Sequence, residues 1–256
     1  QAEDGIRDRS PSRGLGDVYK RQVQRLRWIE PGSFWMGSPG NEKERDDDEL
    51  RHRVTLTRGF WLADTACTQA LWQAVTGQSP SHFKGNAQLP VEQVSWDDVM
   101  QQFLPRLRQR LAGLDARLPT EAEWEYACRA GTETPFHFGN QITPAHVNYD
   151  SNHPYAGGAK GEYREKTVSV KSLPANPWGL YEVHGNVWEW CADGYGPYPT
   201  AEATDPQGVP NAASRVLRGG SWSSRARGCR AASRSHVTPG RRDDDIGFRL
   251  CVSSPI

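Results

Sequence analysis

The sequence predicts an α+β fold with long loops and little regular secondary structure. Ten tryptophans, 25 glycines and 18 prolines among 256 residues indicate many turns held by large aromatic anchors, and a hydrophobic share of 36% is low for a globular chain. Segments with a clear helical or strand period are short, and the chain beyond Gly131 is irregular for about 85 residues. Functional loops or bound ions have to order a stretch of that length.

The bulk composition excludes several classes of protein. Thirty-one Lys and Arg balance 31 Asp and Glu, so no overall field draws the chain to nucleic acid or to an anionic membrane. No apolar run approaches the roughly 20 residues of a membrane helix, and the N-terminus lacks the hydrophobic centre of a secretory signal. We expect no nucleic-acid partner, no membrane insertion and a cytoplasmic location, although the true N-terminus can lie upstream of this sequence.

The five cysteines predict buried, reduced thiols. Their number is odd, they are widely spaced, and no Cys-x-x-Cys pair suggests a zinc or redox site. They are Cys67, Cys128, Cys191, Cys229 and Cys251.

Residues 1–22 are expected to lie outside the fold. They are dense in charge, Gly and Ser and have neither a helical nor a strand period, which is typical of disorder. The run also resembles a translated adapter or cloning scar joined to a sequence that starts near Val23. We therefore place a single domain at residues 23–256.

Strand patterns dominate the first part of this domain. Residues 25–38 alternate apolar and polar side chains around a Pro31-Gly32 turn, which predicts a β-hairpin. The acidic run from Glu42 to Glu49 indicates a solvated loop. Residues 52–65 return to a period of two and predict a further strand.

Three helices follow, each with a Ser or Thr at its N-cap. The first spans residues 68–75. The second spans 95–111 and should kink or break at Pro105. The third spans 120–131. In the second and third helices the cap is followed three residues later by Asp or Glu, the capping-box arrangement, and a glycine ends the third.

Three strand-like segments organise the C-terminal half, at residues 179–193, 215–222 and 246–252. We expect the last two to pair and so close the loop between them. Tryptophans at regular places in these patterns are typical of core anchors and not of a ligand cage. They are Trp124, Trp188, Trp190 and Trp222.

Six motifs occur in an order that resembles the formylglycine-generating, or sulfatase-modifying factor, family. They are GSFWMGS, PVEQVSW, RLPTEAEWEYACRAGT, GLYEVHGNVWEWCAD, RVLRGGSW and IGFRL. The resemblance covers nearly the whole chain from Val23. It implies a C-type-lectin-like fold with extra loops, low secondary-structure content and bound calcium.

The resemblance leaves catalysis open. Authentic enzymes of the family oxidise a sulfatase cysteine to formylglycine with copper and oxygen, at a site that resembles GGS-aromatic-x-Cys-x4-Cys. Counted from Gly219, the first cysteine falls on Ser224 and the second on Cys229. Copper(I) prefers soft thiolates, and a hydroxyl is a poor substitute. We expect copper not to bind, and Cys229 is catalytic only if the oxidase alternative holds.

Iron-dependent sulfoxide synthases also resemble this domain, but their iron-binding histidines lie in an additional bundle. The seven histidines here are scattered without a His-x3-His pair, so each is expected to be a surface or second-layer residue.

The segment between the GGSW and GFR motifs has the composition of a binding surface. Residues 223–245 read SSRARGCRAASRSHVTPGRRDDD, and their Arg and Asp side chains can make charge-assisted hydrogen bonds while rigid strands hold the ends. The segment resembles the variable region of diversity-generating retroelement proteins, because most of it fits randomised adenines in AAC codons. An ordinary solvated loop is the alternative. The expected ligand-binding residues are Ser223, Ser224, Arg225, Arg227, Ser233, Ser235, His236, Val237, Arg242, Asp243, Asp244 and Asp245.

Structural calcium is the cofactor that the resemblance implies, since calcium accepts side-chain and backbone oxygens in adaptable geometry. One site would use Asn186 and Glu189, and a second Asn148 and Glu162. The alternative is that Asn186 makes a turn while Glu189 pairs with an arginine.

A non-catalytic protein that binds a protein or small ligand through residues 223–245 is therefore the leading hypothesis. The rivals are a copper- and oxygen-dependent oxidase and a regulatory module beside a kinase or protease. Some arginines of the region should brace the loop through carboxylate pairs, and the candidates are Arg218, Arg230, Arg234, Arg241 and Arg249.

Overall fold

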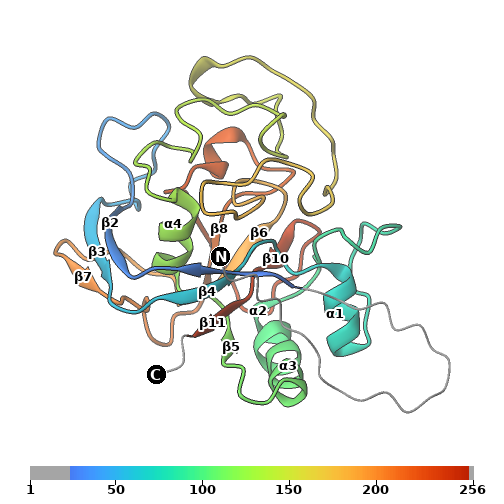
Figure 1. The fold of residues 1–256 in the computed structure, drawn as a ribbon. Helices are drawn as coiled ribbons and strands as arrows, with labels where there is room; N and C mark the ends of the chain where they lie inside the picture. Colours follow the sequence, from blue (N-terminus) through green and yellow to red (C-terminus); the bar gives the residue numbers. More distant parts are fainter. Residues whose placement is uncertain (1–23, 254–256) are drawn as a thin grey trace, which may run out of the picture.

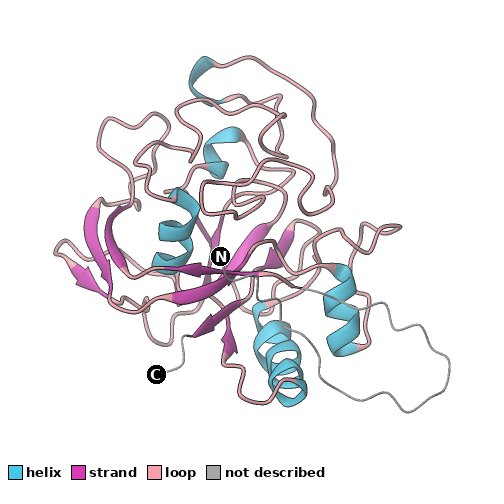
Figure 2. Ribbon diagram, viewed as in Figure 1, coloured by secondary structure: helices cyan, strands magenta, loops and turns pink. Residues whose placement is uncertain are grey.

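A computed structural model describes residues 24–253, so the tail predicted at residues 1–22 lies outside the described part. Three small sheets and four short α-helices surround the core, and loops fill one end of the molecule (Figures 1 and 2). The first sheet has the order β1 (Leu26–Ile29), β4 (Phe60–Ala63), β11 (Cys251–Ser253), β5 (Ala116–Arg117). The second has the order β10 (Ile246–Phe248), β6 (Trp188–Gly194), β8 (Arg215–Arg218), β9 (Arg234–Val237). The third has the order β2 (Gly32–Met36), β3 (His52–Leu56), β7 (Ala203–Thr204).

The hairpin predicted at residues 25–38 is wrong in its pairing. Its two strands exist, but β1 pairs with β4 and β2 pairs with β3, because the chain passes from one sheet to another between them. Residues 52–65 likewise form two strands, β3 and β4, in different sheets. Gly59 lies between these strands, where a Cβ would overlap the ring of Trp28, so the bend needs a glycine.

The predicted helix starts are confirmed. The Thr68 hydroxyl caps α1 (Gln69–Thr76), and capping boxes begin α2 (Trp96–Asp98) and α4 (Glu121–Arg129). Pro105 does not break the second helix. A π-helical stretch (Val99–Phe103) joins α2 to α3 (Leu104–Arg110), and its wider turn accommodates the proline that follows.

The long irregular region is confirmed, but the predicted closure of its C-terminal loop is wrong. Between α4 and β6 the described chain has turns, isolated bridges and one 3₁₀ turn (Tyr155–Gly157). β8 lies between β6 and β9, whereas β10 pairs in parallel with β6. Residues 246–252 do not form one strand, because after β10 the chain enters the first sheet as β11.

Aromatic residues and thiols fill the core as expected. Trp124 and Trp190 are fully buried, while Trp188 and Trp222 are half-buried. All five cysteines are buried and free of disulfides. None of the helices between residues 24 and 253 is long and apolar enough to cross a membrane.

Candidate functional site

The segment from Gly219 to Arg249 starts and ends beside the same strand. β8 and β10 both pair with β6, so the two ends of the segment are held within one sheet (Figure 1). Between them the chain makes a 3₁₀ turn (Ala226–Cys229), forms β9 at one edge of the sheet and returns to the opposite edge at β10.

Buried arginines hold this segment against the rest of the protein. Arg230 donates to both oxygens of Glu49 at 2.6 and 2.7 Å and to Glu42 at 2.7 Å. All three side chains are at most 2% exposed. The solvated loop predicted at residues 42–49 is therefore wrong for Glu42 and Glu49. A buried guanidinium needs carboxylates buried with it, because an unpaired charge in the interior is costly.

A second cluster lies under β8 and β9. Arg218 pairs with Glu121 and Glu125, and Arg234 pairs with Glu121. Burial opposes ionisation of Glu121, but the charges of Arg218 and Arg234 hold its pKa below the usual value.

Arg249 completes the buried set, because it donates to both oxygens of Glu189. The bracing role is thus confirmed for four of the five candidate arginines. The fifth, Arg241, is exposed and pairs with its neighbour Asp243.

A serine–aspartate cluster, formed by Ser221, Ser223, Ser224 and Asp245, lies directly after the double-glycine turn. The Asp245 carboxylate accepts hydrogen bonds from Ser221 at 2.8 Å and Ser223 at 3.0 Å, and the Ser224 hydroxyl accepts from the Ser221 N–H at 3.0 Å. Burial, reinforced by Asp243 and Asp244, raises the pKa of Asp245 against the hydrogen bonds from the two serines. The cluster joins the start of the segment to its end.

Cys229 lies behind this cluster and is fully buried. A Cβ at Gly220 would come within 2.6 Å of its sulfur, so the left-handed glycine turn packs directly on the thiol. Burial raises the pKa of Cys229 to about 12, and among residues 24–253 its sulfur makes no hydrogen bond. A thiol in this setting is protonated at neutral pH and is a poor nucleophile.

The expected ligand-binding residues form two groups in the structure. The group near β10 combines exposed side chains with half-buried ones, and one hydrogen bond, from Ser223 to Asp245, joins residues 223–227 to residues 242–245. It contains Ser223, Ser224, Arg225, Arg227, Arg242, Asp243, Asp244 and Asp245.

The second group lies on or beside β9, at the opposite edge of the sheet. Ser233 is buried at 4% exposure, and Val237 packs on the hydrophobic core. Ser235 is half-buried. His236 is exposed and stacks on Tyr195 at 3.8 Å between ring centroids. The structure therefore does not place all twelve residues in one continuous patch.

Two aromatic neighbours of the first group come from other parts of the chain. Phe83 meets Trp222 edge-on at 5.4 Å, and Tyr163 lies parallel to it at 6.2 Å. The indole N–H of Trp222 donates to the Asp244 carbonyl at 3.2 Å. Sequence reasoning missed Phe83 and Tyr163, because only the tertiary fold brings their loops to Trp222.

The four expected calcium ligands are not all together. Glu189 accepts from Arg249 and, at 2.7 Å, from the indole of Trp124. Glu162 is 67% exposed and pairs with Arg164. The alternative pairing of Glu189 with an arginine is confirmed, and calcium at either carboxylate stays a prediction.

Asn148 and Asn186 do meet, through a 3.1 Å hydrogen bond from the Asn148 amide to the Asn186 oxygen. Asn186 occupies a left-handed turn with φ of 68°. The Asn148 Oδ1 is buried without a hydrogen-bond partner in the described part of the chain. Such an oxygen fits a calcium ligand, and calcium at this place stays a prediction.

Comparison with known proteins places this geometry in a family. The sequence profile of the sulfatase-modifying factor enzyme 1-like domain matches residues 15–254. The formylglycine-generating enzyme of Streptomyces coelicolor is 37% identical over 190 residues, which cover 70% of this chain and 57% of that enzyme. The inactive Cα-formylglycine-generating enzyme 2 of Bos taurus is 32% identical over 213 residues, which cover 80% of this chain and 64% of that protein. The matched region thus spans 57% and 64% of the length of these two relatives.

A solved structure is similar over almost its full length. Treponema denticola variable protein 1 superposes with a TM-score of 0.79 at 27% sequence identity, covering 93% of this chain and 98% of that one. The expected α+β fold with long loops is confirmed. The chain belongs to the sulfatase-modifying factor enzyme 1-like domain family.

Proposed function

We propose that this protein is a non-catalytic binding protein, which displays the exposed group near β10 to a protein or small ligand. The observation that carries the proposal is Ser224 at the place of the first copper-binding cysteine, hydrogen-bonded to Ser221. Two thiolates are needed for a linear copper(I) site, and a serine does not supply one. The remaining thiol, Cys229, is buried and protonated.

The similarity to a variable protein supports the same proposal. This chain shares the fold of Treponema denticola variable protein 1, and here Arg225 and Arg227 are exposed in the segment between the GGSW and GFR motifs. The proposal includes diversification of this surface by a retroelement. A neighbouring reverse-transcriptase gene and an imperfect repeat of the DNA encoding residues 222–249 would support that part, and their absence would remove it without affecting binding as such.

The rival function is copper- and oxygen-dependent oxidation of a sulfatase cysteine. The similarity to formylglycine-generating enzymes supports this alternative. Copper(I) titration in the presence of a competing chelator, followed by oxygen consumption with a cysteine-containing peptide, separates the two. We expect no tight copper(I) binding and no oxygen uptake.

The matched variant is Ser224→Cys, which restores the second thiol at the same backbone position. It should bind copper(I) more tightly than the wild type, and this gain confirms that the assay detects a two-thiolate site. Tight copper binding with oxygen uptake by the unmodified protein would overturn the proposal.

A further inference from the structure

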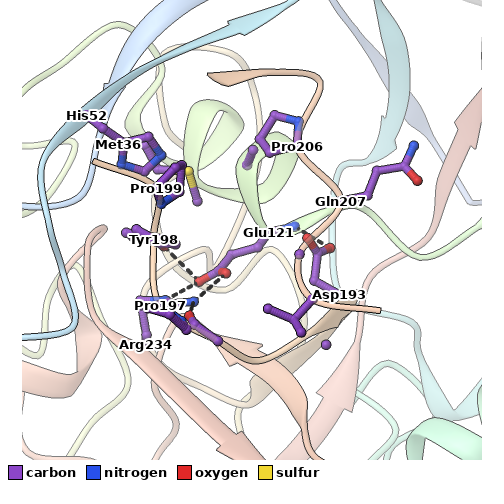
Figure 3. A pocket seen from close by; sticks show the side chains of 15 residues that line it. Met36, His52, Glu121, Asp193, Pro197, Tyr198, Pro199, Pro206, Gln207 and Arg234 are labelled. Atoms are coloured by element: carbon purple, nitrogen blue, oxygen red, sulfur yellow. Dashed lines mark hydrogen bonds and ion pairs between the residues drawn. The ribbon is translucent and has the colours of Figure 1, made fainter. Parts of the chain in front are cut away.

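A small cavity lies outside the serine–aspartate cluster, between two proline-bearing loops and the N-terminus of α4 (Figure 3). Its volume is about 280 Å³, and no member of the cluster lines it. Pockets for drug-sized ligands start at roughly 300 Å³, so this cavity suits a small amine or the end of one side chain. Much of the lining is apolar, from Met36, Ala122, Pro197, Pro199, Pro206 and Val209.

Two of the charged groups at the cavity already satisfy each other. Glu121 accepts two hydrogen bonds from Arg234, at 2.7 and 2.9 Å, and one from the Tyr198 hydroxyl at 2.9 Å. Arg234 also donates to the carbonyl oxygens of Asp48 and Gly196. The charges of Glu121 and Arg234 are therefore already compensated without a ligand.

Asp193 differs from its neighbours, because it is only 3% exposed and has no cationic partner within 4.0 Å in the described part of the chain. One carboxylate oxygen accepts the Glu121 N–H at 2.8 Å, and among residues 24–253 this is its one hydrogen bond. Figure 3 shows the side chain at the cavity beside Glu121, and the dashed line marks this contact. The second oxygen makes no hydrogen bond in the described part of the chain, and the residue lines the cavity.

The charges around Asp193 favour its neutral form. Burial, together with the nearby carboxylates of Glu121 and Glu123, raises its pKa to about 8, although the Glu121 N–H and Arg234 oppose the rise. Below about pH 8 the carboxyl therefore retains its proton. A positive charge inside the cavity would favour the ionised carboxylate and so lower the pKa of Asp193.

We propose that this cavity binds a small organic cation, an alkylammonium or guanidinium group, with Asp193 as the counter-ion. An anion would face Glu121 and Asp193, while the guanidinium of Arg234 that lines the cavity is already paired. A metal ion needs several oxygen ligands, and Asp193 offers one free carboxylate oxygen among apolar walls. An alkyl chain, in contrast, matches the prolines and Met36.

Calorimetric titration of the protein with n-butylammonium tests this proposal, with n-butanol as the neutral control and butyrate as the anionic one. The ammonium group is charged throughout the assay, since amines of this type have a pKa near 10.4. Binding should release close to one proton at pH 7, measured in two buffers of different ionisation enthalpy. Affinity should rise about tenfold from pH 6 to pH 7, because Asp193 has to lose its proton.

The variant Asp193→Asn keeps an oxygen for the Glu121 N–H but cannot ionise, so it should weaken butylammonium binding at least tenfold at pH 7 and remove the pH dependence. The matched control Asp205→Asn changes a carboxylate that does not line this cavity and should bind like the wild type. If Asp193→Asn does not fold, proton release by the wild type still decides the matter.

The proposal is overturned by equal binding of butanol, by binding without proton release or by no binding of butylammonium. A lysine side chain in a short acetylated and amidated peptide distinguishes the two sources of the cation. Peptide binding at least as tight as that of butylammonium identifies a partner's side chain, and weaker binding identifies a free amine.

Discussion

The arginines of residues 218–249 divide into a buried frame and an exposed display. In the frame, Arg218, Arg230, Arg234 and Arg249 have side chains at most 2% exposed, each paired with a glutamate. In the display, Arg227, Arg241 and Arg242 are 51–57% exposed and pair with aspartates. The same residue type thus serves two purposes within one segment. The frame arginines are buried together with their glutamates, whereas the display arginines stay exposed, even where the partner of Arg242, Asp98, is largely buried.

The largest expected effect comes from breaking the frame. Glu125→Gln leaves Arg218 and Arg129 buried with one carboxylate fewer, and removal of one partner from a buried pair costs about 3–5 kcal/mol. Urea denaturation measures the loss. The control Glu133→Gln removes the exposed partner of Arg51 and should change stability by less than about 1 kcal/mol. Equal losses of stability in the two variants would show that buried and exposed ion pairs contribute alike, contrary to the proposed difference between frame and display.

Acid should produce the next largest loss of stability, through the buried His184. Burial, with a contribution from His137, lowers the pKa of His184 to about 3, while its Nδ1 contacts the Cys229 carbonyl at 2.7 Å. The unfolded chain binds a proton at this residue below its ordinary pKa of about 6.5, and the folded protein does not until about pH 3. The stability that neutral His184 contributes is therefore present above about pH 6.5 and is lost as the pH falls through this window, while the raised pKa of Asp193 contributes with the opposite sign.

One linked proton gives a slope of up to about 1.4 kcal/mol per pH unit. Denaturation at pH 7, 6, 5 and 4 measures this slope, and His184→Gln should reduce it. An unchanged slope in the variant would assign the acid sensitivity to other groups.

Calcium is expected to act on the loops outside the frame. If Asn148 is a ligand, calcium at 100 times its Kd should stabilise chelator-treated protein by about 2.7 kcal/mol, seen as a rise in Tm. Asn148→Ala should abolish the rise. Glu189→Ala should lower Tm equally with and without calcium, since this carboxylate serves Arg249. An unchanged wild-type Tm on calcium addition would argue against the site.

The smallest effect on stability is expected in the display. Arg225→Ala and Arg241→Ala remove exposed side chains, and surface substitutions of this kind usually stay within about 0.5 kcal/mol. Thermal unfolding checks this expectation. A loss comparable to that of Glu125→Gln would place these arginines in the frame.

The sequence predicted local features better than distant pairings. The caps at Thr68, Ser95 and Thr120 depend on residues three positions apart, so the pattern alone identifies them. Strand positions followed from alternation, but strand partners did not. Alternation predicts which face is buried and does not indicate which of several strands lies alongside.

The candidate site shows the same limit. Its ends and the loss of the first thiol were visible in the GGSW and GFR motifs, as was the need for some arginines to pair. The carboxylates that pair with them lie 93 to 188 residues away from Arg218 and Arg230, so no local pattern connects them. For the same reason the burial of Glu42 and Glu49 was missed.

The contact between Arg230 and Glu49 also has a consequence for folding during synthesis on the ribosome. The two residues are separated by 181 positions, so Glu49 leaves the ribosome long before its partner is made. Translation adds about 5–20 residues per second, so roughly 10–40 s pass between the synthesis of Glu49 and that of Arg230. During that interval the carboxylates of the acidic loop stay hydrated at the surface of an incomplete chain. The synthesis of Arg230 therefore decides when the loop can finally be buried.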